Sequence, residues 1–272
     1  MLADAGFDVF IANCRGNKYS QGHADATVTT DNVKYWEFSF HEMGVYDNPA
    51  IIEMVTNVTG VRRMYYVGHS MGGTSLAIML SERPEYNERI STAFLLAPAL
   101  YLGSTLKYLQ PFFKSVNYYQ YSFNKFVHGK LDAYKSLKQA VGRRPEEVCL
   151  REEGACETIE PNGDSVIISS AHFSGFCGNL LFLGGGYDAP QTNYTTFTQA
   201  LGTFPETTST KTLTHFFQFI KSNTFCQFNY GFSWINRLKY GKDTSPCYNL
   251  DRISAPLVVY WGQNDFFIKW TS

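Results

Sequence analysis

The chain has 272 residues, which suffices for one large α/β domain or for a core that carries an inserted subdomain. Its formal net charge is −1 and charged residues make up 17% of it, so the composition indicates no nucleic-acid partner. No run of 18 or more apolar residues occurs, and the sequence therefore predicts no transmembrane helix.

Short apolar runs alternate with helix-like segments in the first hundred residues. We expect buried strands where apolar residues stand together in a short run, and helices where they fall on one face. In chain order, these segments are a strand at 7–12, a helix at 48–55, a strand at 64–67, a helix at 74–82 and a strand at 91–98. Asn48 is the expected N-cap of the first helix and Pro49 its first residue. The alternation predicts an α/β protein whose parallel sheet has helices on both faces.

This alternation stops after the third strand and returns near the end of the chain. Residues 101–246 contain helix-like segments without strands between them, and residues 256–261 form another apolar run typical of a buried strand. An insertion of that size in an α/β core predicts a helical cap subdomain. We therefore divide the chain into core residues 1–100, a cap at 101–246 and a return to the core at 247–272.

The pentapeptide Gly68-His69-Ser70-Met71-Gly72 lies between the second predicted strand and the second predicted helix. A G-x-S-x-G sequence in that setting is typical of a nucleophile elbow, a sharp turn that exposes the serine hydroxyl. Serine needs such a place because it is a poor nucleophile until a base reaches its hydroxyl. The glycines at both ends, Gly68 and Gly72, allow the chain to turn. The sequence thus predicts Ser70 as a nucleophile, with His69 packed beneath the turn.

A serine nucleophile of this kind works with an acid and a histidine that follow it in the order Ser, Asp or Glu, His. Asp265 stands just beyond the last predicted strand, where doubly wound sheets place functional groups. An aspartate after a strand also forms turns and caps helices. We favour Asp265 as the triad acid because the same chain carries the elbow.

The histidines of the chain supply no clear base. None follows the candidate triad acid, and they stand at positions 23, 41, 69, 128, 172 and 215. His172 and His215 fall in the predicted cap, where we interpret them as structural. His41 and Glu42 begin an H-E-x-x-H zinc pattern, but Val45 takes the place of the second histidine. We therefore predict no metal site and no cofactor.

Two signals point to an oxidising compartment, although the first residues lack the features of a signal peptide and by themselves favour the cytosol. Asn57 and Asn193 each begin an Asn-x-Thr glycosylation acceptor sequence. The six cysteines are an even number, which suits disulfides. By proximity in the chain we expect the pairs Cys149–Cys156 and Cys226–Cys247.

Seven segments in order carry a family resemblance: 2–9, 13–20, 38–47, 68–72, 96–99, 177–180 and 262–265. Together they resemble the acid lipase family, which includes the gastric and lysosomal acid lipases and their arthropod relatives. The resemblance runs from end to end and is weakest in the cap. It departs at Gln263, where the family has a second glycine, and at 268–269, where the family has Ala-Asp. The family's better-known members also have a cysteine before the one that matches Cys177, so their cap disulfide is not carried over.

The resemblance implies a secreted or lysosomal α/β-hydrolase that cleaves triacylglycerols or cholesteryl esters. It implies Ser70 as the nucleophile, Asp265 as the triad acid and the Met71 backbone N–H as one oxyanion donor. In such an enzyme a cap of amphipathic helices covers an apolar acyl pocket and moves at a lipid surface. The implied partners are a lipid ester substrate at an interface and, transiently, a membrane or lipid droplet.

The resemblance also predicts sequence beyond both ends of these 272 residues. Upstream it implies a signal peptide, the first strands and a His-Gly loop that donates the second oxyanion N–H, from a strand between 7–12 and 64–67. Downstream it implies a strand, a helix and the triad histidine. On this interpretation Met1 is an internal methionine, the sheet is incomplete, and the chain alone hydrolyses esters poorly.

Two alternative functions fit the same residues. One is a non-catalytic lipid-binding or carrier protein on a hydrolase scaffold, in which the loss of the base is real. The other is a carboxylesterase for soluble esters. An in-frame histidine about 25 to 35 residues beyond Ser272 favours the enzyme. A stop codon directly after Ser272 favours the carrier.

Overall fold

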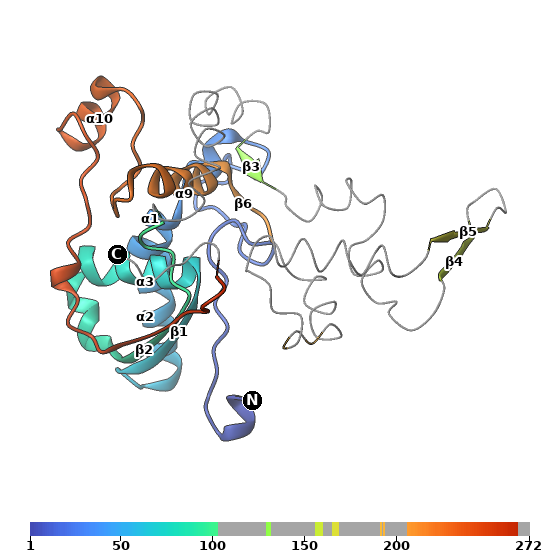
Figure 1. The fold of residues 1–272 in the computed structure, drawn as a ribbon. Helices are drawn as coiled ribbons and strands as arrows, with labels where there is room; N and C mark the ends of the chain where they lie inside the picture. Colours follow the sequence, from blue (N-terminus) through green and yellow to red (C-terminus); the bar gives the residue numbers. More distant parts are fainter. Residues whose placement is uncertain are drawn as a thin grey trace. The chain divides into compact units, whose positions relative to one another are not determined.

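The computed structural model describes residues 1–102, 129–131, 156–159, 165–168, 191, 193 and 206–265. The chain divides into two compact units. The first comprises residues 1–131, 208–262 and 268–272, and the second comprises residues 132–207 and 263–267. Figure 1 shows the described helices and strands. The cap boundaries expected at 101 and 246 stay a prediction, since most of that range lies outside the described residues.

Three parallel strands form the sheet of the first unit: β1 (Met64–His69), β2 (Ile90–Leu96) and β7 (Leu257–Tyr260). Their order is β1-β2-β7, so β2 is the central strand of the three. In the register of β1 and β2, Tyr66 lies beside Ala93. The three apolar runs predicted to form these strands are confirmed. Their parallel direction follows from the helical crossover between the first two.

A continuous helical run precedes β1, made of α1 (Phe40–Glu42), the π-helical turn η3 (Met43–Asp47) and α2 (Asn48–Thr59). It begins at a capping box, in which the Ser39 hydroxyl accepts from the His41 N–H and the Glu42 carboxylate accepts from the Ser39 N–H. The expectation that Asn48 caps α2 is therefore wrong. Pro49 has no N–H to donate to the Val45 carbonyl one turn back, and this carbonyl accepts from the Arg83 guanidinium at 3.2 Å.

Helix α3 (Met71–Glu82) is buried without interruption from residue 73 to residue 81. Three of its apolar side chains belong to one core cluster with residues of α2, η4, β2 and the segment before β7: Ile52, Leu76, Met79, Leu80, Tyr86, Ile90, Ala93, Leu95 and Ala255. Full burial of one such aliphatic side chain contributes about 1.5–3 kcal/mol. This cluster fixes α3 against the sheet, and with it the turn that precedes α3.

Helices cover one face of the sheet in the described part of the chain. Along β1, Met64 and Tyr66 pack against the core cluster, whereas Tyr65 and Val67 are 61% and 54% exposed. Successive residues of a strand point to opposite faces, so the exposed pair marks the other face. The second layer of helices that the alternation predicted is not found among the described residues.

The apolar run at 7–12 forms no strand, which corrects the first prediction along the chain. Phe7 is 52% and Ile11 87% exposed. A strand needs a neighbour that pairs with its backbone N–H and C=O groups, and no described strand pairs with this run. Apolar composition alone was therefore insufficient, because pairing decides whether a run becomes a strand.

Shorter elements and two helices complete the described residues. The first part of the chain adds the 3-10 turns η1 (Ala3–Ala5), η2 (Val33–Trp36) and η4 (Pro84–Arg89). The later part adds β3 (Lys130–Leu131), β6 (Thr208–Ser209), α9 (Thr210–Ser222), α10 (Ser233–Tyr240) and η7 (Leu250–Arg252), with β3 and β6 antiparallel. In the second unit, β4 (Cys156–Ile159) and β5 (Ser165–Ile168) form an antiparallel pair. None of the described helices has the length and apolar character to span a membrane.

A disulfide joins Cys226 to Cys247 and confirms one of the two expected pairs. It closes the segment that contains α10. Cys149, from the other expected pair, lies outside the described residues. Cys14 is a free thiol, and its burial together with the nearby Asp47 carboxylate raises its pKa to about 11. At neutral pH this thiol is therefore protonated and a weak nucleophile.

Candidate active site

Ser70 forms the turn between the end of β1 and the start of α3. Its backbone has φ 50° and ψ −112°, a conformation that is rare for a residue with a side chain. Such a conformation costs of order 1–3 kcal/mol, which the surrounding structure must offset. The Ser70 N–H donates to the Leu96 carbonyl at 2.9 Å and ties the turn to β2. Ser70 is partly exposed, so a strand, a sharp turn and a helix present its side chain toward solvent.

Two glycines allow the chain to fold tightly around Ser70. A Cβ on Gly68 would lie 2.9 Å from the carbonyl carbon of Gly72 and from the nitrogen of Gly73. A Cβ on Gly73 would lie 2.7 Å from the Cβ of Pro98. Gly72, by contrast, has open space where a Cβ would stand. Gly68 is thus a steric requirement of the turn, as expected, but the second such glycine is Gly73 and not Gly72.

Met71 is the first residue of α3. The first N–H groups of a helix have no partner within it, and the helix dipole adds partial positive charge at this end. Within the described part of the chain, the Met71 N–H forms no hydrogen bond. A donor without a partner beside Ser70 is suited to an oxygen that develops negative charge, which is the chemistry of an oxyanion hole.

Side-chain hydrogen bonds hold the first turn of α3 in place. The Thr74 hydroxyl donates to the Ala99 carbonyl at 2.8 Å, and the Tyr66 hydroxyl donates to the Gly72 carbonyl at 3.1 Å. Burial raises the pKa of Tyr66 to about 12, so its hydroxyl keeps the proton that it donates. Sequence patterns did not single out Thr74 or Tyr66, since both acceptors are backbone groups whose position only the fold determines.

The loop after β2 contributes a second strained residue beside the elbow. Ala97 has φ 47°, and its N–H donates to the Tyr260 carbonyl at 2.7 Å. The next residue, Pro98, is buried in the close contact with Gly73. Residues in such backbone conformations cluster at functional sites. The only sequence signal for this position was the segment 96–99, whose pattern carried part of the family resemblance.

Asp265 lies five residues beyond Tyr260, the last residue of β7. Tyr260 pairs with Leu96 in the parallel register, so β7 ends at the sheet edge where β2 ends and where Ser70 follows β1. Functional groups of open parallel sheets gather at this edge. Asp265 itself belongs to the second unit and Ser70 to the first. Their coupling through an imidazole therefore stays a prediction.

No described histidine forms a hydrogen bond with the Ser70 hydroxyl. His69 is exposed, which corrects the expectation that it packs beneath the turn. It follows Val67 by two residues in β1 and so shares the face of the sheet that the described helices leave open. His41 Nδ1 lies 2.9 Å from the Tyr248 hydroxyl, and burial lowers the pKa of His41.

His215 has the structural role predicted for it. It is fully buried, its ring stacks on Phe40 with centroids 4.2 Å apart, and both ring nitrogens have partners. Nε2 lies 2.9 Å from the Cys226 carbonyl, which can only accept, so Nε2 carries the proton and Nδ1 accepts from the Ser39 hydroxyl at 3.0 Å. Burial lowers the pKa of His215 to about 3. His172, the other histidine with a predicted structural role, lies outside the described residues.

Both predicted glycosylation acceptors are exposed. Asn57 lies in the last turn of α2, and Asn193 is an exposed residue of the second unit. An acceptor asparagine must be accessible to carry a glycan. Glycosylation at these two positions stays a prediction.

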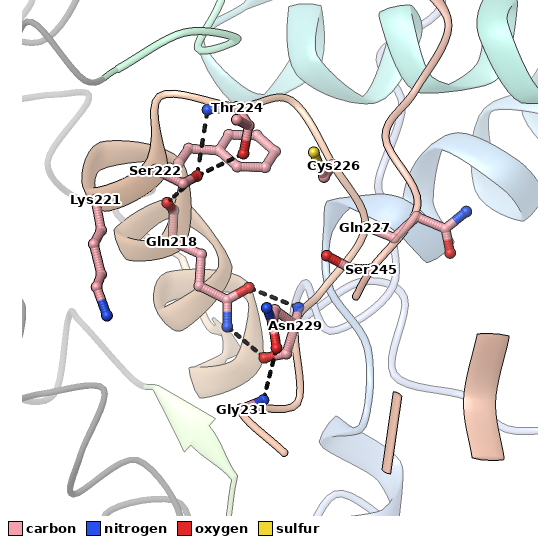
Figure 2. Close-up of a pocket in the computed structure, with 10 residues that line it drawn as sticks. Gln218, Lys221, Ser222, Thr224, Cys226, Gln227, Asn229, Gly231 and Ser245 are labelled. Atoms are coloured by element: carbon pink, nitrogen blue, oxygen red, sulfur yellow. Dashed lines mark hydrogen bonds between the residues drawn. The ribbon is translucent and has the colours of Figure 1, made fainter. Parts of the chain in front are cut away.

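A cavity of about 410 Å³ opens at the end of α9. Figure 2 shows amide and hydroxyl side chains among the residues that line it, with the Gln218 amide hydrogen-bonded to the backbone N–H and C=O of Asn229 at 2.8 Å and 2.7 Å. Neither Ser70 nor Met71 lines this cavity. The apolar acyl pocket implied by the resemblance therefore also stays a prediction.

A parallel sheet that leads through a strained serine into a buried helix defines an α/β protein with the turn typical of serine hydrolases. A family model described as alpha/beta hydrolase fold matches residues 1–272. The chain belongs to this family.

Known relatives also support the narrower resemblance to acid lipases. The chain is 35% identical to Lipase 3 of Drosophila melanogaster, 33% identical to gastric triacylglycerol lipase of Rattus norvegicus and 31% identical to the putative lysosomal acid lipase/cholesteryl ester hydrolase of Crotalus adamanteus. These alignments cover 98%, 97% and 97% of this chain, and 62%, 60% and 60% of the relatives. The chain therefore spans about three fifths of the length of these proteins.

Proposed function

We propose that this chain forms the larger part of a serine ester hydrolase of the acid lipase type. The observation that carries the proposal is the strained backbone of Ser70 between β1 and α3. In the proposed reaction the Ser70 hydroxyl attacks the ester carbonyl while an imidazole takes its proton. The Met71 N–H donates to the oxyanion, the alcohol leaves, and water releases the acid from the acyl-enzyme.

The proposed substrates are neutral lipid esters, triacylglycerols or cholesteryl esters. The support is the similarity to proteins named gastric triacylglycerol lipase and putative lysosomal acid lipase/cholesteryl ester hydrolase, over 97% of this chain. A secreted or lysosomal location agrees with the Cys226–Cys247 disulfide and with the exposed acceptor residues Asn57 and Asn193.

The proposed triad joins Ser70 and Asp265 through a histidine that lies outside these 272 residues. Two observations support this assignment. The four described histidines, His23, His41, His69 and His215, form no hydrogen bond with the Ser70 hydroxyl, and the chain spans about three fifths of the relatives' length. Asp265 would accept from this imidazole and stabilise the imidazolium that forms during the reaction.

A fluorophosphonate probe tests the nucleophile in the protein that carries this chain. Because the probe forms a covalent bond with an activated serine, peptide mass spectrometry should find it on Ser70. The Ser70→Ala variant should lose labelling and lower kcat/KM for tributyrin by about 10³-fold or more. Ser254→Ala, which changes an exposed serine before β7, is the matched control and should keep both.

Two outcomes contradict the proposal. Labelling of another serine would remove Ser70 from the reaction. A protein that binds long-chain esters but turns over neither emulsified triolein nor soluble esters would be a carrier. If only soluble esters are hydrolysed, Ser70 remains the assigned nucleophile and the proposed lipid substrate class is wrong.

A further inference from the structure

Helix α10 (Ser233–Tyr240) exposes two large apolar side chains to solvent and buries one polar side chain. Trp234 and Leu238 are 65% and 76% exposed, and they neighbour each other because four residues separate them along the helix. Phe232, just before the helix, is 61% exposed. Asn236 is 2% exposed and faces inward. An ordinary surface helix would instead bury its large apolar side chains.

Polar contacts fix α10 in this orientation. The Asn236 amide accepts from the Tyr230 N–H at 3.1 Å and donates to the Asn229 side chain at 3.1 Å and to the Asp243 carbonyl at 2.9 Å. On the same side of the helix, the Tyr240 hydroxyl donates to the Phe228 carbonyl at 2.8 Å. A buried amide with these partners cannot turn outward without leaving backbone groups unpaired. These hydrogen bonds therefore keep Trp234 and Leu238 exposed.

Cationic side chains border these apolar residues. Residues 232–243 contain three cations, Arg237, Lys239 and Lys242, against one carboxylate, Asp243, which pairs with Arg237. All four are exposed. Lys239 also lies over the Tyr230 ring at 5.9 Å. An apolar stripe with an excess of positive charge beside it is complementary to a surface that has apolar chains below anionic headgroups.

We propose that the α10 patch, defined as Phe232, Trp234 and Leu238 with Arg237, Lys239 and Lys242, binds an anionic lipid surface. Trp and Phe side chains prefer the boundary between headgroups and acyl chains, and lysines beside them attract anionic headgroups. None of these residues lines the cavity at the end of α9, and we therefore assign the patch to an extended surface and not to a small ligand. In Figure 1, α10 lies apart from the strands of the sheet. Lipid binding here is separate from the chemistry proposed for Ser70.

Vesicle co-sedimentation of the protein that carries this chain tests the patch. The Ser70→Ala background removes lipid hydrolysis, so a failure of the patch and a failure of the proposed catalysis give separate results. Binding to vesicles of phosphatidylcholine with phosphatidylglycerol should exceed binding to phosphatidylcholine alone, and it should weaken with salt. Trp234→Ser/Leu238→Ser should lower the affinity by about tenfold or more, because two apolar side chains no longer insert.

Matched controls separate the patch from general effects. Met54→Ser/Val61→Ser removes two exposed apolar side chains near α2 and should keep the affinity. Lys239→Glu/Lys242→Glu should abolish the preference for anionic vesicles, whereas Lys34→Glu/Arg62→Glu, with the same change of charge elsewhere, should retain most of it. Each variant must keep the melting temperature of its parent.

A direct contact assay completes the test. Brominated lipid should quench tryptophan fluorescence, and Trp234→Phe should remove most of this quenching while vesicle binding remains. Equal binding by the Trp234→Ser/Leu238→Ser variant and its parent overturns the proposal. It is also overturned if that variant abolishes a dimer of the protein in solution without affecting vesicle binding, because the patch then serves a second copy of the chain.

Discussion

At the scale of single residues, the elbow depends on the positions where a Cβ atom would collide with neighbouring atoms. Ser70 adopts φ 50° in a turn that packs against β2 and the loop after it. Gly68 and Gly73 permit this packing because they lack a Cβ, which at either position would lie under 3.0 Å from neighbouring atoms. A Cβ on Gly72 would instead lie in open space. The family-like pattern G-x-S-x-G names Gly72 and leaves out Gly73, so the pattern and the steric requirement differ by one residue.

The steric difference between the two glycines predicts opposite stability changes. Gly73→Ala should lower the free energy of unfolding by about 1–3 kcal/mol, because the new methyl group overlaps Pro98. Gly72→Ala should leave the free energy of unfolding unchanged or raise it by up to about 1 kcal/mol, because alanine has a higher helix propensity than glycine. Urea unfolding of both variants measures this. Equal losses in the two variants would contradict the close contact between α3 and the loop after β2.

At the scale of elements, a buried imidazole joins two helices far apart in the sequence. His215 of α9 bonds the Ser39 hydroxyl at the start of α1 and stacks on Phe40. The same serine belongs to the capping box of α1. After burial, the charges of His41 and Lys211 also lower the pKa of His215, and Lys211 on α9 forms an ion pair with Glu42 on α1. Neutral His215 therefore holds the start of the helical run that leads to β1.

This imidazole makes the stability of the protein depend on pH. The pKa of His215 falls from 6.5 to about 3 on folding, so the unfolded chain binds the extra proton between these values. The stabilising contribution of the neutral ring is complete above pH 6.5 and is lost as the pH falls toward 3. The slope should be about 1.4 kcal/mol per pH unit in that window.

The variant His215→Gln provides the comparison, because glutamine keeps a donor and an acceptor but does not titrate. Urea unfolding at a series of pH values should show a free energy of unfolding that falls more steeply in acid for the parent than for the variant. The variant starts from a lower stability at neutral pH, since the amide does not fill the site of the ring. Parallel pH curves would show that His215 binds its proton equally in the folded and unfolded protein, so that its pKa does not fall on folding.

At the scale of the whole molecule, the sheet is covered on one face by the described helices. On the other face, Tyr65 and Val67 of β1 are exposed. The exposed run at 7–12 lies near that face. The chain spans about three fifths of the length of its lipase relatives. The described residues thus present a strained serine and a helix N-terminus, but no imidazole within hydrogen-bonding distance of the Ser70 hydroxyl.

This arrangement predicts low activity for the 272 residues alone. Their turnover of p-nitrophenyl butyrate should lie about 10³-fold or more below that of a longer protein that includes the triad histidine, because a serine without its base retains only the rate from binding and oxyanion donors. Circular dichroism should establish that both proteins are folded. Similar turnover by the two proteins would mean that a histidine within this chain acts as the base.

Local sequence patterns were sufficient for part of the fold and of the site. The apolar runs at 64–67, 91–98 and 256–261 predicted β1, β2 and β7, since each is a continuous run of the length that a buried strand needs. The apolar segments on either side of Ser70 also predicted its position between a strand and a helix. Proximity in the chain also predicted the Cys226–Cys247 disulfide, because a short loop brings both ends together readily.

The sequence by itself thus determined the three strands β1, β2 and β7 and the serine that follows β1, because those features depend on neighbours along the chain. Only the tertiary structure decided that the run at 7–12 forms no strand, that His69 is exposed, that a Cβ on Gly73 would collide with Pro98 and that Trp234 and Leu238 of α10 are exposed. Each of these depends on a partner or a close approach from a distant segment. Pairing and packing of that kind are properties of the folded chain, and no local pattern encodes them.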